Sequence, residues 1–403
     1  MFASQRRTSG CGPMSPTGMM RFLLRAIGLA ACLPFLPACH TPPPLKPYVA
    51  YVVNSQSSTL VAVDLTDFRV TASLPVVAQP ERIHIRPQAR QLYVASALGK
   101  ISVVAYPHLR VVSTLDVGRS SRDMEFPPDG NAAYILDPAD REVVFVDCVG
   151  GSDDAAERAI PRVTGRLRLG GTLRDLALSP DGKTLVVAAE NPNLLTFINA
   201  TARQPLGTVE VGQSPGPMVI LPDSSKVFVA DTGDEKVSIA DVAERRLLSN
   251  IEIGTRPTAI LLKPDGGEVF VLAAPSSTLA ILDAFHDDLE QTFPLGANPA
   301  SGVFRTDSSV LFIANAGDGS VLALDVQNRA VLAAPHVGLE PLALALTPDE
   351  TLLAVIDRAG SSLAILRADP NGLTNNRSTL LTTVPVGASP ADVVIPDLNN
   401  QKR

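Results

Sequence analysis

The side chains best suited to binding or chemistry lie in short runs that alternate apolar and polar residues. Arginine guanidiniums present paired N–H donors that match carboxylates and phosphates, so these runs predict a site for a small anionic or zwitterionic ligand. The alternative is that the arginines and acids neutralise one another, because structural ion-pair networks are common. The candidate donors are Arg82, His84, Arg122 and Arg174, and the acids beside them are Asp123, Asp175 and Asp392.

His84 supports a second hypothesis, an enzyme active site. It is the only histidine in these runs, and Asp123 or Glu125 would orient its ring for a role as ligand or base. The other histidines do not share a metal-ligand spacing with it, and neither a phosphate loop nor a nucleophile elbow appears. The sequence therefore predicts no metal site and no bound cofactor.

The runs belong to a repeat that occurs eight times. An apolar quartet recurs at Tyr51, Tyr93, Tyr134, Val186, Phe228, Phe270, Phe312 and Ala354. Turns of the type Pro180-Asp181-Gly182 precede most quartets, and three further apolar runs complete each unit of about 42 residues. Short alternating runs rich in Val, Ile and Leu predict half-buried strands. We therefore expect an all-β chain in which each unit is a four-stranded antiparallel blade of a β-propeller.

The order of the runs predicts how the ring closes. The chain enters at three outer strands and ends with the unpaired run Ala391–Pro396, which should complete the first blade. One face of each inner run is apolar and should pack between blades. The other face reads Arg82, His84 and Arg86 in the second blade, and it should line the central channel. Charged residues then cluster on one side of that channel, while small apolar residues occupy the opposite side.

Two insertions extend this pattern, within Gly150–Pro161 and within Arg367–Ser378. Loops of this kind hold function or are tolerated decoration.

The repeat resembles the YVTN family of bacterial β-propeller proteins. The resemblance rests on Tyr51-Val52-Val53-Asn54, on Val386-Gly387-Ala388-Ser389-Pro390 and on the Pro-Asp-Gly turns, and it covers about residues 48–397. Members often have seven blades, so seven is the alternative to the eight repeats of this chain. Similar rings hold haem d1, and related lactonases and quinone-linked enzymes also use propellers, which is what the enzyme hypothesis would imply.

The N-terminus has the order of an export signal. Arg21 and Arg25 precede an apolar stretch that ends in Leu36-Pro37-Ala38-Cys39. This resembles the lipobox of bacterial lipoproteins, which implies cleavage before Cys39 and its lipidation. Residues 1–38 are then a signal peptide, for which Met20 is a better start than Met1, and 39–47 form a Pro-rich tether. A plain secretory signal is the alternative.

The net charge of the chain argues against one class of partner, nucleic acids. The 403-residue chain carries a net charge of −7, and loss of residues 1–38 leaves 30 basic residues against 41 acidic ones. Such an acidic chain lacks the electrostatic footprint of a nucleic-acid-binding protein. Four cysteines are too few for a disulfide scaffold, and Cys148 is expected to be a small buried hydrophobe.

These observations lead to one functional prediction. We expect an exported, lipid-anchored, monomeric propeller in the cell envelope that acts as a non-enzymatic binding or scaffold module. Its partner would be an envelope protein, a glycan or a small anionic ligand. The alternative is a cofactor-dependent or hydrolytic propeller enzyme, haem d1-, quinone- or lactonase-like, with an axial site around His84. Residues 48–397 would form the propeller and 398–403 a C-terminal tail.

Overall fold

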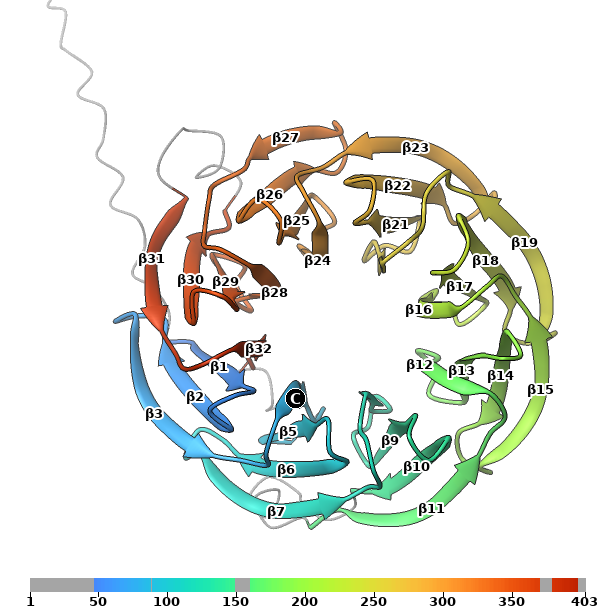
Figure 1. Cartoon of the computed structure of the whole chain (residues 1–403), viewed down its shortest axis with the longest axis horizontal. Coiled ribbons are helices and arrows are strands. Elements are labelled where there is room, and N and C mark those ends of the chain that lie inside the picture. Colours follow the sequence, from blue (N-terminus) through green and yellow to red (C-terminus); the bar gives the residue numbers. More distant parts are fainter. Residues whose placement is uncertain (1–46, 88, 149–159, 370–378, 398–403) are drawn as a thin grey trace, which may run out of the picture. The chain divides into compact units, whose positions relative to one another are not determined.

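Each repeat folds into one four-stranded antiparallel sheet, and eight such sheets stand as blades around a common axis (Figure 1). The computed structural model describes residues 47–87, 89–148, 160–369 and 379–397. The prediction of an all-β propeller with eight blades is confirmed, and the alternative of seven blades is wrong. Within the described ranges there is no helix long and apolar enough to cross a membrane.

In every blade the inner strand lies nearest the axis and the other three strands follow outward. From the axis outward, blade 1 contains β32 (Pro390–Val394), β1 (Val49–Asn54), β2 (Thr59–Asp64) and β3 (Arg69–Pro75). Blade 2 contains β4 (Pro80–Ile85), β5 (Gln91–Ser96), β6 (Lys100–Ala105) and β7 (Arg110–Asp116). Blade 3 contains β8 (Asp123–Glu125), β9 (Ala132–Asp137), β10 (Glu142–Asp147) and β11 (Arg162–Arg168). Blade 4 contains β12 (Thr172–Leu178), β13 (Thr184–Glu190), β14 (Leu194–Asn199) and β15 (Gln204–Glu210).

The other four blades follow in chain order. Blade 5 contains β16 (Pro215–Ile220), β17 (Lys226–Asp231), β18 (Lys236–Asp241) and β19 (Arg246–Glu252). Blade 6 contains β20 (Ala259–Leu262), β21 (Glu268–Ala273), β22 (Thr278–Asp283) and β23 (Asp288–Pro294). Blade 7 contains β24 (Pro299–Phe304), β25 (Val310–Asn315), β26 (Ser320–Asp325) and β27 (Ala330–Ala333). Blade 8 contains β28 (Pro341–Leu346), β29 (Leu352–Asp357), β30 (Ser362–Arg367) and β31 (Leu380–Pro385).

Both ends of the described chain meet in blade 1. The inner strand β32 pairs antiparallel with β1, with Tyr51 opposite Val394 and Val52 opposite Val393. This confirms that the last strand completes the first blade. The hydrogen bonds of one sheet therefore fasten the start of the ring to its end, and residues from Leu45 onward form one compact unit.

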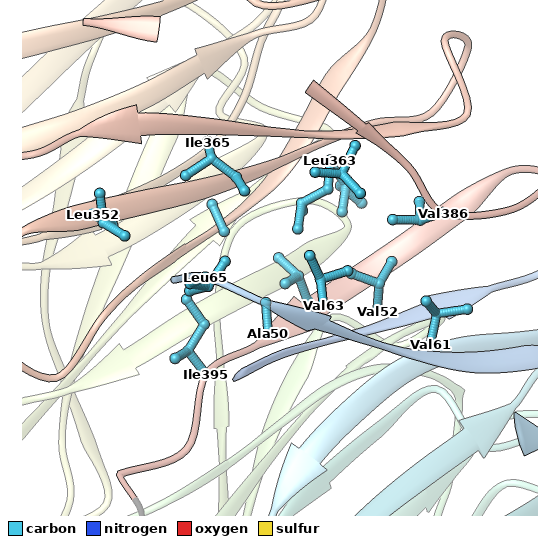
Figure 2. Close-up of a cluster of buried hydrophobic side chains, with 14 of the residues drawn as sticks. Ala50, Val52, Val61, Val63, Leu65, Leu352, Leu363, Ile365, Val386 and Ile395 are labelled. Carbon is cyan, nitrogen blue, oxygen red and sulfur yellow. The ribbon is translucent and has the colours of Figure 1, made fainter. Parts of the chain in front are cut away.

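Apolar side chains fill the space between neighbouring blades. The described residues contain eight buried clusters, and each cluster joins two adjacent blades. Figure 2 shows the cluster between blades 8 and 1, where Val52 and Val63 face Leu363 and Ile365. Full burial of such a side chain stabilises the fold by about 1.5–3 kcal/mol. The apolar face of the inner strands contributes to these clusters, as the alternating pattern predicted.

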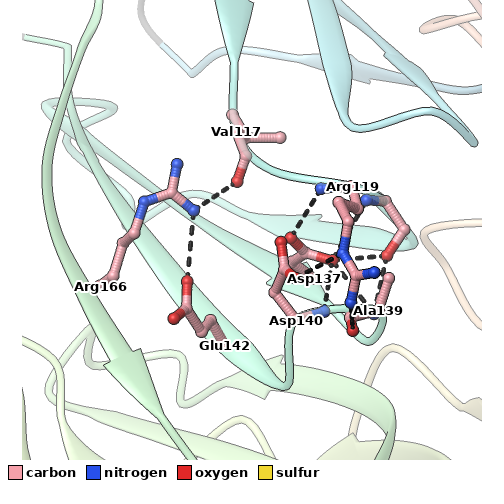
Figure 3. Close-up of polar contacts among 8 residues, drawn as sticks. Val117, Arg119, Asp137, Ala139, Asp140, Glu142 and Arg166 are labelled. Atoms are coloured by element: carbon pink, nitrogen blue, oxygen red, sulfur yellow. Dashed lines mark hydrogen bonds and ion pairs between the residues drawn. The ribbon is translucent and has the colours of Figure 1, made fainter.

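A buried Asn or Asp ends the second strand of most blades and holds the loop that enters the same blade. In blade 3, Asp137 Oδ2 accepts the Arg119 N–H at 3.0 Å, and Asp137 Oδ1 accepts the Ser120 N–H at 3.1 Å (Figure 3). Asp357 Oδ1 accepts the Glu340 N–H at 2.8 Å in blade 8. Asp137 and Asp357, which stand where the repeat motif has Asn, therefore satisfy loop amides that would otherwise lack partners. Asn54 holds its loop in the opposite sense, because its Nδ2 donates to the Val386 carbonyl at 3.2 Å.

The same contact explains why glycine recurs in the Val-Gly element of the repeat. A Cβ atom on Gly338 would lie 2.2 Å from Asp357 Oδ2, and one on Gly212 would lie 2.3 Å from Asp231 Oδ2. Real Cβ atoms do not approach an oxygen so closely. The glycine and the acid therefore occur together because the loop backbone must touch the carboxylate.

Gly338→Ala should lower the free energy of unfolding by about 2–3 kcal/mol, because the added methyl group displaces the Asp357 carboxylate from the loop amides. Gly170→Ala is the matched control, since a Cβ there meets no atom within 4 Å. Equilibrium denaturation of both variants measures the difference. Equal stability of the two variants would contradict this account of the repeat.

Candidate functional site

One mouth of the ring holds a cavity of about 690 Å³. Its wall includes residues of the inner strands of blades 2 to 7, which places it on the axis. The predicted residues that line it are Arg82, Arg122, Asp123, Arg174 and Asp175. On the opposite side the inner-strand positions are small or apolar, as predicted, and include Pro217, Ala259 and Ser301, but Arg256 of the turn before β20 adds a charge there that was not predicted.

A second cavity of about 580 Å³ continues this mouth toward blades 8 and 1. The two cavities share Arg82, Ala300 and Ser301, so they are neighbouring lobes of one mouth. Glu81 and Arg358 are the other charged residues of the second lobe. The remaining wall of that lobe consists mainly of small side chains, so charge is concentrated in the first lobe.

The guanidiniums of the first lobe outnumber its acids. Within the described part of the chain, the side chains of Arg82, Arg122 and Arg256 form no ion pair and no hydrogen bond with another residue. Arg174 lies 3.9 Å from Glu190 and not against Asp175. The described arginines and aspartates of this lobe therefore form no direct ion pairs with one another, although the charge of Arg82 opposes the burial that raises the pKa of Asp392.

Arg256 is the functional candidate that sequence reasoning missed. It precedes Pro257 in the turn before β20, so it lies outside the alternating strand positions used to assign the channel wall. Arg122 and Arg174 lie two residues before Met124 and Leu176, and the equivalent residue before Ile260 is Thr258. Arg256 lies two residues earlier still, so the pattern that predicted Arg122 and Arg174 does not reach it.

Two of the predicted acids join neighbouring inner strands. Asp175 Oδ2 accepts the Met218 N–H at 3.0 Å, which links β12 to β16. Asp392 Oδ2 accepts the Ile83 N–H at 3.1 Å, which links β32 to β4. These carboxylates satisfy amides that point across the gap between blades, so they have a structural role in addition to any role in the cavity.

Asp123 of β8 and Asp175 of β12 line the same lobe from the neighbouring inner strands of blades 3 and 4. Burial, and then the negative charge of Asp123, raises the pKa of Asp175 well above its ordinary value. Burial and the charge of Asp123 also raise the pKa of Glu125 to about 8. Of these groups Glu125, with its pKa of about 8, keeps its proton at neutral pH.

His84 lies deeper than the cavity. It lines neither lobe, and its Nε2 is buried with no hydrogen-bond partner among the residues that the structure describes. Burial lowers the pKa of His84, Asp123 and Asp392 oppose that shift, and Arg82 adds to it. Lowering the pKa favours the neutral imidazole. Glu125 and Asp392 also line neither lobe.

Arg86 does not face the channel, and that prediction is wrong. It is only 4% exposed, and its guanidinium donates to the carbonyl oxygens of Gly130 and Cys148 in blade 3. Arg305 makes the same contact at the interface of blades 7 and 8, with the carbonyl oxygens of Glu350 and Ala368. The end of the inner strand therefore turns its side chain into the interface between blades.

Other predictions fall at the edge of the described residues. Cys148 is a free, fully buried thiol, as expected, and the Tyr93 hydroxyl donates to its Sγ at 3.4 Å. Most of the two predicted insertions, together with Cys39, the tether and the C-terminal tail, lie outside the described ranges.

Comparisons with known proteins support the fold. No protein-family model matches the sequence, and no curated protein matches it. The chain is similar in structure to NirN, a dihydro-haem d1 dehydrogenase in complex with DHE, with a TM-score of 0.71 and 14% identity over 88% of this chain and 76% of NirN. It is also similar to AztD from Citrobacter koseri in its apo form, with a TM-score of 0.67 and 10% identity over 87% of this chain and 98% of AztD.

A further similarity is to hydrazine synthase from Kuenenia stuttgartiensis, with a TM-score of 0.54 and 19% identity over 70% of this chain and 92% of that one. At such identities these similarities show the β-propeller fold and not a shared function. The resemblance to the YVTN repeat stays a prediction.

Glu125→Gln should change how stability depends on pH. The folded chain holds the Glu125 proton more tightly than the unfolded chain, so its contribution is complete below the ordinary pKa and is lost as the pH rises through about 8. Between about pH 5 and pH 9 the parent should therefore lose about 2 kcal/mol more than the variant, after allowance for partial solvation. Denaturation across that range measures this, with Glu210→Gln on exposed β15 as control. Parallel profiles for the parent and Glu125→Gln would contradict it.

Proposed function

We propose that this protein is a non-enzymatic binding module, and that the mouth of its ring takes a small anionic ligand. One observation carries this proposal: Arg82, Arg122 and Arg256 converge on one cavity and form no ion pair or side-chain hydrogen bond with another described residue. Unpaired guanidiniums gathered in a concave site attract anions strongly, because the surrounding protein excludes part of the screening solvent.

A small ligand fits this mouth better than an envelope protein or a glycan. The cavity of about 690 Å³ lies in the range of small-molecule sites, and its charged groups converge inside the ring and do not spread over an outer surface. If the propeller also binds a protein, its loops and not its mouth would form that interface. The module itself would act as a monomer, because the ring closes on its own first and last strands.

We also propose that the ring is exported and held at a membrane of the cell envelope. The support comes from the sequence before the ring, where a short positive and apolar segment ends in Leu36-Pro37-Ala38-Cys39. Lipidated Cys39 and the Pro-rich segment 39–47 would keep the propeller close to the membrane surface.

An enzyme centred on His84 is the second candidate, and the orphaned Nε2 atom of that residue is the observation that favours it. NirN shows that a similar ring can belong to a haem d1 enzyme. The donor set of this chain does not fit such a group, because His84 lines neither lobe and the described residues contain no group of three His, Cys, Asp or Glu side chains suited to a metal. We therefore derive no catalytic step.

Small anions should stabilise the ring against heat. Sulfate or citrate in excess should raise the melting temperature by a few degrees relative to chloride at equal ionic strength, because the anion binds only the folded mouth. Arg256→Gln should remove most of this shift, whereas Arg168→Gln, the same change on the outer strand β11, should keep it. Equal shifts in the two variants would contradict the site. A visible absorption band or a stoichiometric metal in protein from its own host would favour the enzyme instead.

Cys39→Ser should move the protein from the membrane fraction to the soluble envelope fraction, because the serine hydroxyl cannot take the thioether-linked lipid. Fractionation and incorporation of labelled fatty acid measure this in the native host. Labelling that persists in the variant, or a parent that carries no lipid, would show that residues 1–38 are an ordinary secretory signal.

A further inference from the structure

The charge of the first lobe indicates what kind of anion it takes. Four guanidiniums and two carboxyls line it, and the carboxyls are Asp123 and Asp175. With both carboxyls ionised the wall carries an excess of two positive charges, and with one proton on the pair it carries three. A ligand with a single charge would leave most of this excess unmatched, and mutual repulsion among the arginines would remain.

The carboxyls of Asp123 and Asp175 would repel such an anion when they are ionised. Because Asp123 and Asp175 line the lobe from neighbouring inner strands, a ligand bound to the arginines lies beside their negative charge. Protonation of the pair removes part of that repulsion, so ligand and proton favour each other's binding.

The charged and titratable groups around the pair come from several elements. They are Arg82 and His84 of β4, Arg122 and Glu125 of blade 3, Arg174 of β12, Glu190 of β13, Arg256 of blade 6 and Asp392 of β32. Arg174 is directed toward Glu190, and Asp175 also accepts the Met218 N–H of β16. Of the nearby acids, Asp123 and Asp175 alone line the lobe together with the unpaired arginines.

We propose that the mouth binds a small anion with two or more negative charges on Arg82, Arg122 and Arg256, and that the Asp123–Asp175 pair takes up one proton from water as the anion binds. This inference rests on the proposed function and names its ligand class, multiply charged carboxylates or oxyanions. It assigns the arginines to the ligand and the carboxyl pair to the proton.

Titration calorimetry with acetate, succinate, citrate and sulfate tests the charge requirement. We expect succinate and sulfate to bind at least tenfold more tightly than acetate, and citrate more tightly still. Arg122→Gln and Arg256→Gln should each weaken citrate binding by about 10- to 100-fold, because each removes charged hydrogen bonds. Arg168→Gln should leave it unchanged. Comparing the affinities for sulfate and succinate distinguishes recognition of an oxyanion from recognition of a carboxylate.

The proposed proton uptake is tested by measuring citrate binding over a pH range in which citrate keeps its full charge. Citrate affinity should fall by up to about tenfold per pH unit as the pH rises, with the heat of binding varying with buffer ionisation enthalpy because a proton is taken up. Asp175→Asn should bind more tightly and without this dependence. Asp123→Asn should do the same and is the safer variant, since Asp123 Oδ1 accepts only the Met124 N–H of its own strand.

Each other result contradicts a defined part of the inference. A pH dependence that persists in both Asn variants, or that disappears in Glu125→Gln instead, overturns the assignment to the carboxyl pair. Binding that is equally tight for acetate and citrate overturns the charge requirement while the proposed function stands. If no anion binds at all, the inference and the anion-binding role fail together.

Discussion

The structure depends on the packing of one blade against the next. A four-stranded sheet of short strands cannot cover its own two faces, so each blade must bury both against neighbours. Eight apolar clusters fill the eight interfaces, and the cluster between blades 8 and 1 exists because β32 returns to pair with β1. The interface of blades 8 and 1 therefore requires the ring to be closed, and the buried Asn or Asp residues only fix the loops that lead into most blades.

Closure brings eight inner strands close together around an axis, and this crowding creates the chemistry of the mouth. Polar atoms on neighbouring inner strands face one another across narrow gaps, where Asp175 and Asp392 accept amides of the next blade. The same burial that makes these bonds useful disfavours ionised carboxyls, which is why the pKa values of Asp175, Glu125 and Asp392 are raised. Raised carboxyl pKa values near the axis thus follow from the geometry of the ring.

The fold was predictable from the sequence because each blade repeats its pattern, and the period of two on each inner strand placed Asp123 and Asp175 on the wall. The prediction from that period was wrong for Arg86, which follows the end of β4. Its side chain lies in the interface between blades 2 and 3 and donates to carbonyl oxygens of blade 3. Arg256 was missed because it belongs to a turn, where no strand period applies. The effect of the Asp123 charge on the pKa of Asp175 could not be predicted, since it depends on the spacing of two blades and not on either strand alone.

The arginines of the mouth are not needed to build a blade. Blades 5 to 8 place Pro217, Ala259, Ser301 and Ala343 at the wall positions that Arg82, Asp123 and Asp175 occupy in blades 2 to 4, and their interfaces are equally buried. Ser301 shows that a neutral hydroxyl can link neighbouring inner strands, because its Oγ donates to the Leu342 carbonyl. Like charges held together cost free energy in the empty ring. A fold that can be built without Arg82, Arg122 and Arg256 keeps them unpaired at that cost, and a bound anion is the partner that would offset it.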